Sequence, residues 1–263
     1  MGLTHALVRM KVEPYVGLAV LVVVFASGMI GRLIRGKLPE SHLSDESKGV
    51  VTLAMGVVGT LTALVLGLLI ATASGTFNTR NQEITNLAAK MIQLDRLLRL
   101  FGPDADDERG LLRNYTTMQL KDLFPEGRAK SVLENPKTIV LLEELEDRLS
   151  AMEGHSPHQR WLLTEAKAQA TEIAELRWLL IEQNAIGIPV PVLVMVLFWL
   201  CLLFMSFGLF GPDNATVTVA LFFCALACAG AVQTILDLSR PFEGIIRVSD
   251  KPLRHALDVI THG

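Results

Sequence analysis

The sequence predicts an all-α membrane protein with four spans per subunit and a polar helical insert between spans two and three. Hydrophobic residues make up 51% of its 263 residues, charged residues only 19%, and the mean hydropathy is +0.41. The charges are concentrated, because residues 80–182 hold 14 of the 24 Lys and Arg and 18 of the 27 Asp and Glu. This composition is too apolar for an ordinary soluble domain.

Four largely uncharged windows are long enough to cross about 30 Å of hydrocarbon, which takes about 20 helical residues. We predict spans at about residues 14–34, 49–76, 186–210 and 214–236. The last two follow one another across Gly211-Pro212-Asp213-Asn214, a strong turn signal, so we expect a tight helical hairpin. Arg9 and Lys11 precede the first window, which leaves a cleaved signal peptide as the alternative for that segment.

The spans divide the chain into an N-terminal membrane hairpin (1–79), a helical cytoplasmic domain (80–182), a C-terminal membrane hairpin (183–236) and a cytoplasmic tail (237–263). The turn between spans three and four carries no Lys or Arg, whereas the tail carries Arg240, Arg247, Lys251 and Arg254. The positive-inside rule therefore predicts that both termini and the insert are cytoplasmic. The segment 32–48 opposes this orientation, because it holds four basic residues.

The insert is predicted to be helical, because apolar residues recur in it at intervals of three and four. One such stripe comprises Ile84, Leu87, Met91, Leu94, Leu98 and Phe101, and another comprises Thr138, Leu142, Leu145, Leu149 and Met152. Breaks are expected at Gly102-Pro103, at Pro125 to Gly127 and at Gly154 to Pro157. A last helix from about Pro157 runs toward span three, which begins or bends at Pro189 and Pro191.

The second span carries two rows of residues at a strict interval of four. The first row is small and consists of Gly59, Ala63, Gly67, Ala71 and Gly75. Small residues let another helix approach closely in lipid, where packing is the main attraction. The helix that packs on this row belongs either to the same chain or to a second copy. The adjacent row consists of Thr60, Leu64, Leu68, Thr72 and Thr76. If the small row packs on a neighbouring copy, this row faces a shared axis and forms a narrow apolar neck that can gate by dewetting.

The second span is also longer than a crossing requires. Its 31 uncharged residues, 49–79, reach about 46 Å at 1.5 Å per residue. The lower end, residues 74–79, is polar but uncharged, which suits a water-filled vestibule. At the upper end Ser44 is a suitable N-cap, and Asp45 and Glu46 follow it in the first turn.

Other candidate sites have simpler interpretations. His155, His158 and Glu153 lack the spacing of a helical zinc motif and are expected in a solvated loop. The acidic run 104–108 is expected to begin a helix, and Asp237 to form a turn toward Arg240. Trp161 and Trp178 are expected in the core or in a subunit contact.

The same considerations exclude other function classes. The net charge of −3 and pI near 6.1 argue against a nucleic-acid partner. Cys201, Cys224 and Cys228 lie in apolar runs, so no metal site or disulfide is expected. No catalytic motif is present in the sequence, so we expect neither an enzyme nor a cofactor.

Four segments of the chain, taken together, resemble the bestrophin-like family of bacterial membrane proteins, which is distantly similar to the bestrophin ion channels. They are Leu43 to Lys48, Ala63 to Ala71, Phe77 to Glu83, and Asp237 to Ser249, the last being the most specific. The resemblance covers about residues 35–257. It implies a homopentameric channel in the bacterial inner membrane, with four spans per subunit, cytoplasmic termini and a pore lined by span two.

The resemblance also implies roles for single residues. Leu64-Val65-Leu66-Gly67-Leu68 is similar to the neck motif, which makes Thr60, Leu64 and Leu68 the neck; bestrophin necks are bulkier and entirely apolar. The acidic cluster of the eukaryotic calcium clasp is missing, so calcium gating is not implied.

The identity of the permeant ion is predicted from the resemblance and from the charges near the ends of the second span. The family relationship favours small inorganic anions such as chloride. Lys48 and Arg80 at the pore mouths would favour them too, although Asp45, Glu46 and Glu83 could cancel that field. The alternative function is a non-conducting membrane-anchored scaffold or sensor, whose cytoplasmic helices recruit partners.

Overall fold

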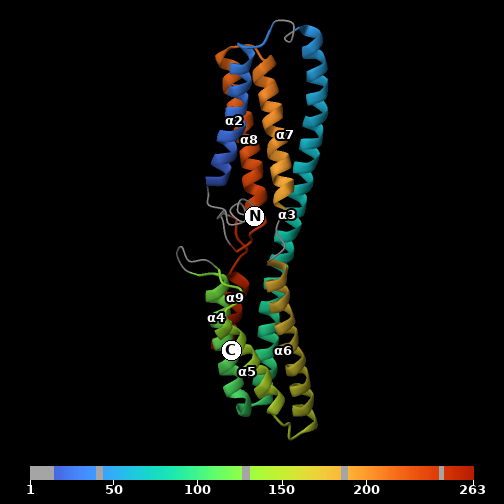
Figure 1. Ribbon diagram of the computed structural model, residues 1–263. Helices are drawn as coiled ribbons and strands as arrows, with labels where there is room; N and C mark the ends of the chain where they lie inside the picture. Colours follow the sequence, from blue (N-terminus) through green and yellow to red (C-terminus); the bar gives the residue numbers. More distant parts are fainter. Residues whose placement is uncertain (1–14, 40–43, 126–130, 185–188, 243–245) are drawn as a thin grey trace. The chain divides into compact units, whose positions relative to one another are not determined.

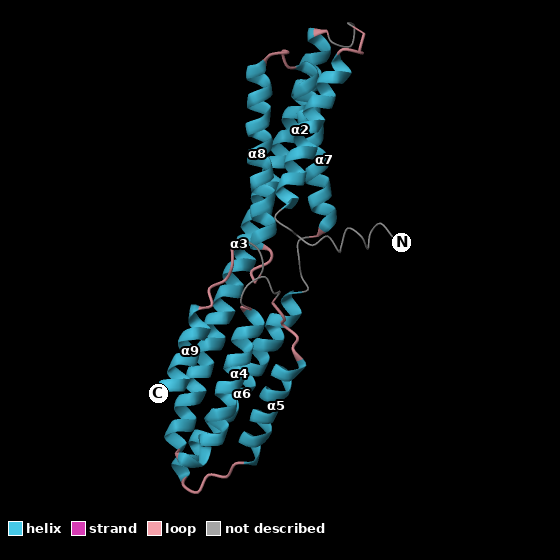
Figure 2. Ribbon diagram, turned by 90° about the vertical axis from the view of Figure 1, so that its left-hand side faces the viewer, coloured by secondary structure: helices cyan, strands magenta, loops and turns pink. Residues whose placement is uncertain are grey.

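The structure is a computed structural model that describes residues 15–39, 44–125, 131–184, 189–242 and 246–263. The elements formed by these residues are helices joined by short loops (Figures 1 and 2), which confirms the predicted all-α class. The chain divides into two compact units. One comprises residues 1–76 and 188–240, and the other comprises residues 77–187 and 241–263.

Among the residues that the structure describes, the first unit contains four helices that are apolar and long enough to cross a membrane. They are α2 (Tyr15–Arg35), the beginning of α3 (Asp45–Phe101), α7 (Val190–Phe210) and α8 (Ala215–Leu238). These helices coincide with the four predicted spans to within a few residues, except that α3 continues beyond residue 76. Pro189 is the N-cap of α7 and Pro191 lies in its first turn, so the third span begins at the two prolines.

Helix α2 packs along both α7 and α8 (Figure 2), so the two helices of the predicted hairpin are joined through α2 as well as through their turn. The contact with α7 is a backbone approach. A Cβ atom added to Gly208 would overlap the carbonyl oxygen of Gly28, and one added to Gly31 would overlap that of Met205. Glycine is therefore required on both helices, as at close helix crossings in lipid. The close packing of α2 against α7 favours a retained span over a cleaved signal peptide for this segment.

The turn between α7 and α8 binds the end of α2. The Arg32 guanidinium donates to the Thr218 hydroxyl at 2.5 Å and pairs with the Asp213 carboxylate at 2.5 Å. The Arg35 guanidinium donates to the Gly211 carbonyl. Two of the four basic residues in segment 32–48 therefore have partners in the turn.

At the other end of α2 the first-turn backbone is capped by a side chain. Gln233 of α8 accepts a hydrogen bond from the Gly17 N–H at 2.9 Å and donates one to the Asp237 carboxylate at 3.0 Å. The Asp237 carbonyl in turn accepts from the Arg240 N–H. Asp237 therefore forms the predicted turn while its carboxylate is held by Gln233.

Helix α3 is one continuous helix of 57 residues. The predicted second span ends at 76, within the polar segment 74–79, but the helix continues through that segment. The segment contains no proline, and its glycine, Gly75, does not have a positive φ, so nothing in it breaks the backbone of the helix. The first helix end after residue 45 comes at Gly102, whose φ of 114° strongly favours glycine and which precedes Pro103.

The second unit contains the rest of α3 with η2 (Pro103–Ala105), α4 (Asp106–Leu123), α5 (Pro136–Ala151), α6 (Pro157–Asn184) and α9 (Lys251–His262). The whole predicted stripe from Ile84 to Phe101 is buried in its core, and so are Leu142, Leu145 and Leu149 of α5. The acidic run begins α4, as predicted. The segment that the sequence set apart as a tail contributes Leu253, Ala256 and Ile260 of α9 to the same core.

The α2–α7 crossing gives the first prediction. We expect Gly208→Ala to lower the stability of the membrane unit by about 1–3 kcal/mol, because its methyl group would meet a backbone carbonyl that cannot move aside. The melting temperature of the purified protein in detergent measures this. Gly230→Ala on α8 is the matched control, since its Cβ meets nothing within 4 Å and the variant is expected to melt no lower than wild type. Equal melting of all three proteins would contradict the close crossing.

A second prediction concerns Glu146 on α5. Partial burial raises the pKa of its carboxyl group, and the charges of Asp147 and Glu143 raise it further. A raised pKa in the folded state means that ionised Glu146 destabilises the fold near neutral pH. We expect Glu146→Gln to stabilise the protein at pH 7 by less than about 1 kcal/mol, because solvent screens the site. The gain should shrink as pH falls toward the ordinary carboxyl pKa, where Glu146 is protonated anyway; a gain that is constant with pH would refute this account.

Candidate functional site

The candidate site is the face of α3 that the chain's own membrane core leaves uncovered. The buried face consists of residues spaced three or four apart: Met55, Val58, Thr62, Val65, Leu66, Leu69 and Ala73. Most of them pack against the cluster formed by α2, α7 and α8. Of the most apolar window of α3 only 6% is buried, against 22–28% in the other three spans. The second span is thus the one that is least covered by its own chain.

The predicted neck row lies on this uncovered face. Leu64 and Leu68 are 69% and 65% exposed, Thr60 and Thr72 are also exposed, and Thr76 is half-buried. The helix geometry explains the difference along the row. Four residues turn an α-helix by about 400°, so each step at interval four moves about 40° around the axis. The row therefore starts on the uncovered face and drifts toward the buried face by Thr76.

The small row turns around the helix axis in the same direction, and this turn carries it away from the chain's own core. Gly59 lies nearest the chain's own core, since a Cβ atom there would lie 3.7 Å from Leu203. Ala63 and Ala71 are exposed, and added Cβ atoms at Gly67 and Gly75 would meet nothing within 4 Å. The lower part of this row is therefore free to contact another molecule, whereas Gly59 serves packing within the chain.

The threonine hydroxyls of the neck row are already used as donors. Thr60 donates to the Gly56 carbonyl, Thr72 to the Leu68 carbonyl and Thr76 to the Thr72 carbonyl, at 2.9 to 3.1 Å. Each hydroxyl has one proton, so in this rotamer the oxygen presents only acceptor sites outward. An anion at this level gains a hydroxyl donor only if the backbone bond is given up.

The two residues predicted at the pore mouths have different environments. Lys48 is exposed in the first turn of α3, after Ser44, whose hydroxyl accepts from the Ser47 N–H. Arg80 is only 3% exposed, and its guanidinium donates to the buried Glu83 carboxylate at 2.9 Å. Pairing cancels most of the field of Arg80 outside the chain, so this geometry does not favour it as the source of a positive ring.

Of the remaining candidates, the tryptophans differ from one expectation. Trp161 and Trp178 on α6 are 58% and 52% exposed, so a place in the chain's own core is wrong and a subunit contact remains the prediction. His155 lies in the loop before α6, and His158 stacks on Trp161 at 6.1 Å between ring centroids. Within the described ranges no group of three metal-ligating side chains comes together.

Sequence reasoning missed a polar cluster in the core of the second unit. The Arg177 guanidinium donates to the Gln119 side chain at 2.6 Å and lies 5.9 Å from the centre of the Tyr115 ring. Burial raises the pKa of the Tyr115 hydroxyl, and the Arg177 charge opposes that shift. In the sequence these residues are polar positions within apolar stripes, but only the fold reveals which of them pair. The cluster is buried and positions α4 against α6.

Comparison with known proteins agrees with this architecture. The family profile described as the bestrophin-like domain matches residues 20–253, most of the chain, so the protein belongs to the bestrophin-like family. No curated protein sequence matches the chain.

Solved structures of bacterial bestrophin homologues share the fold. A homologue from Klebsiella pneumoniae is 14% identical, with a TM-score of 0.64, and the alignment covers 94% of this chain and 99% of that one. A tryptophan-to-alanine mutant of a Klebsiella pneumoniae homologue is 15% identical, with a TM-score of 0.65 over 94% and 97% of the two chains. A membrane protein carrying a glycine-to-alanine mutation is 14% identical, with a TM-score of 0.67 over 93% and 98%.

Proposed function

We propose that the protein is a homo-oligomeric, pentameric ion channel whose neck is formed by Thr60, Leu64 and Leu68 of α3. The observation that carries the proposal is the uncovered face of α3. A membrane span that packs only one face within its chain has to cover the other with lipid, with a neighbouring copy or with water. Leu64 and Leu68 lie on that face and are largely exposed, and family membership supports a shared axis. A ring of leucines there is an apolar constriction that can dewet.

The permeant ions in this proposal are small inorganic anions such as chloride. Support comes from the family relationship and from exposed Lys48 at one end of the span. The threonine hydroxyls oppose it in their present rotamer, because they donate to backbone carbonyls. Anion passage therefore requires either that those hydroxyls rotate toward the anion or that water alone solvates the anion at this level.

The neck is tested by widening it. We expect Leu64→Ala with Leu68→Ala to raise the single-channel conductance at least several-fold, because shorter side chains let water fill the constriction. The measurement is current through purified protein in planar bilayers, with the reversal potential in a chloride gradient reporting selectivity. The matched control is Leu18→Ala with Leu226→Ala, two exposed leucines on α2 and α8, which should conduct like wild type.

The outcomes of the neck experiment are distinct. Absence of current in both wild type and the widened variant would overturn the channel and leave the scaffold or sensor function. A control pair that changes conductance as much as the neck pair would move the constriction away from α3. A reversal potential near the equilibrium potential of the cation would refute anion selectivity but not the channel.

We also propose the orientation in a bacterial inner membrane, with both termini and the helical unit in the cytoplasm. Segment 32–48 opposes this orientation by its charge, but the objection is weakened because Arg32 pairs with Asp213 and Arg35 binds the Gly211 carbonyl. The basic residues of the C-terminal segment then dominate the charge bias.

We expect a green fluorescent protein fused to the C-terminus to fluoresce in a bacterial host and alkaline phosphatase fused there to be inactive. Each reporter works on only one side of the membrane, so the reverse pattern would invert the proposed topology.

A further inference from the structure

The membrane unit has a groove between α3, α7 and α8, which shares Lys48 with the proposed pore mouth but not the neck residues. Its volume is about 620 Å³, and its apolar lining includes Met55, Leu203, Phe207, Phe210 and Cys224. The groove exists because α3 has no side chain at two lining positions, Gly56 and Gly59. A Cβ atom added to Gly56 would meet nothing within 4 Å, so the space beside it is open.

The groove has the length of one bilayer leaflet. Along α3 its lining runs from Lys48 to Gly59, a separation of eleven residues, or about 17 Å at 1.5 Å per residue. Half of a hydrocarbon core of about 30 Å is about 15 Å. On α7 and α8 the lining residues lie within a few turns of the connection at Gly211, so the groove starts at the end of the helices and stops near their middle.

Two basic residues lie at the end where the groove starts. Lys48 lines it, and so does Gly211, whose carbonyl accepts from the Arg35 guanidinium. The ion pairs found among the described residues include neither Lys48 nor Arg35, whereas Asp213 of the same turn is occupied by Arg32. Asp45 and Glu46 lie on the first turn of α3, ahead of Lys48 and outside the lining.

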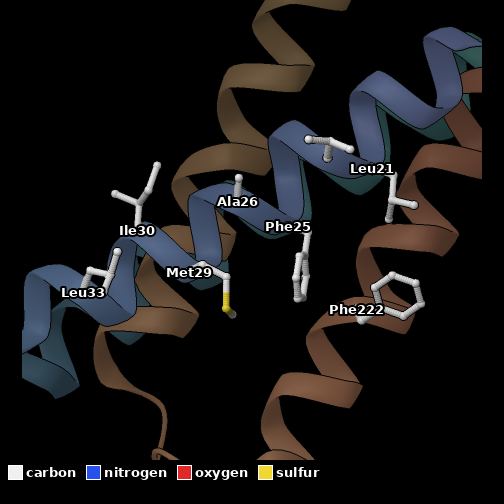
Figure 3. A pocket seen from close by; sticks show the side chains of 8 residues that line it. Leu21, Phe25, Ala26, Met29, Ile30, Leu33 and Phe222 are labelled. Atoms are coloured by element: carbon white, nitrogen blue, oxygen red, sulfur yellow. The ribbon is translucent and has the colours of Figure 1, made fainter.

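A second hollow in the same unit shows that this charge is a particular feature. It lies between α2 and α8 and has a volume of about 400 Å³ (Figure 3). Its lining is apolar throughout, with Phe25 against Phe222 at 5.7 Å between ring centroids. Nothing in that lining distinguishes one lipid headgroup from another.

We propose that the groove between α3, α7 and α8 binds an anionic phospholipid, with an acyl chain along the apolar lining and the phosphate beside Lys48 and Arg35. The ligand has to be apolar over one leaflet and negative at its end, which is the chemistry of that lipid class. Lys48 and Arg35 supply the positive charge with which a lipid phosphate forms charge-assisted hydrogen bonds. The proposal does not depend on ion conduction, because the groove belongs to a single chain.

Native mass spectrometry of the purified protein tests the headgroup preference. Phosphatidylglycerol and phosphatidylcholine with identical acyl chains are titrated in turn, and we expect the anionic lipid to bind more tightly. Lys48→Gln should weaken its binding about fivefold, as expected for one basic residue near a lipid phosphate. The control Lys37→Gln removes an exposed lysine outside the groove and should leave binding unchanged. Equal binding of the two lipids, or equal losses in the two variants, would overturn the proposal.

Filling the groove tests the position of the acyl chain. A phosphatidylglycerol carrying a diazirine in its acyl chain should cross-link to peptides that contain residues 203–224. We expect Gly56→Leu to abolish that cross-link and Gly49→Leu to preserve it, since Gly49 also has open space around it but lies outside the lining. Both substitutions replace a helical glycine by the same side chain, so helix propensity changes equally.

Two outcomes of the cross-linking experiment would refute the lipid site. One is a cross-link that persists in Gly56→Leu, which would place the acyl chain elsewhere. The other is the absence of lipid cross-links together with oxidative pairing of Cys224 between copies, which would assign the groove to a neighbouring subunit.

Discussion

The arrangement of the protein depends on the division of helix α3 into a covered and an uncovered face. Burial of one side against α2, α7 and α8 uses residues from Met55 to Leu69, whereas the other side carries leucines that the chain does not cover. In water such a surface would cause aggregation. In a bilayer it costs little, because lipid or another helix can cover it through packing.

The spans and the amphipathic stripes could be predicted from the sequence because each depends on a local property. A window such as 190–210 is recognised by its lack of charge, and the stripe from Ile84 to Phe101 by its spacing. The continuity of α3 was missed for a physical reason. A polar segment such as 74–79 reads as an end of a span, but a helix ends only where its backbone is broken, and no such break occurs before Gly102.

The closest helix contact was also missed. Gly28, Gly31 and Gly208 are ordinary small residues in their spans, and nothing in their spacing distinguishes them from the longer row that begins at Gly59. Which glycine meets a backbone depends on the rotation of each helix about its axis, and that follows from the packing of the whole unit. The same limit applies to Arg80, whose partner Glu83 is three residues away and whose burial only the fold reveals.

The contacts at the end of α2 impose an order on biosynthesis. Arg35 is separated from its acceptor Gly211 by 176 residues, and Gly28 is slightly farther along the chain from Gly208. At ordinary translation rates of about 5–20 residues per second, the ribosome needs roughly 9–35 seconds to supply those partners. During that interval the first span lacks its helix partner α7, and Arg32 and Arg35 lack the turn residues that bind them in the folded protein. Assembly of the membrane unit is therefore completed from the C-terminal half of the nascent chain.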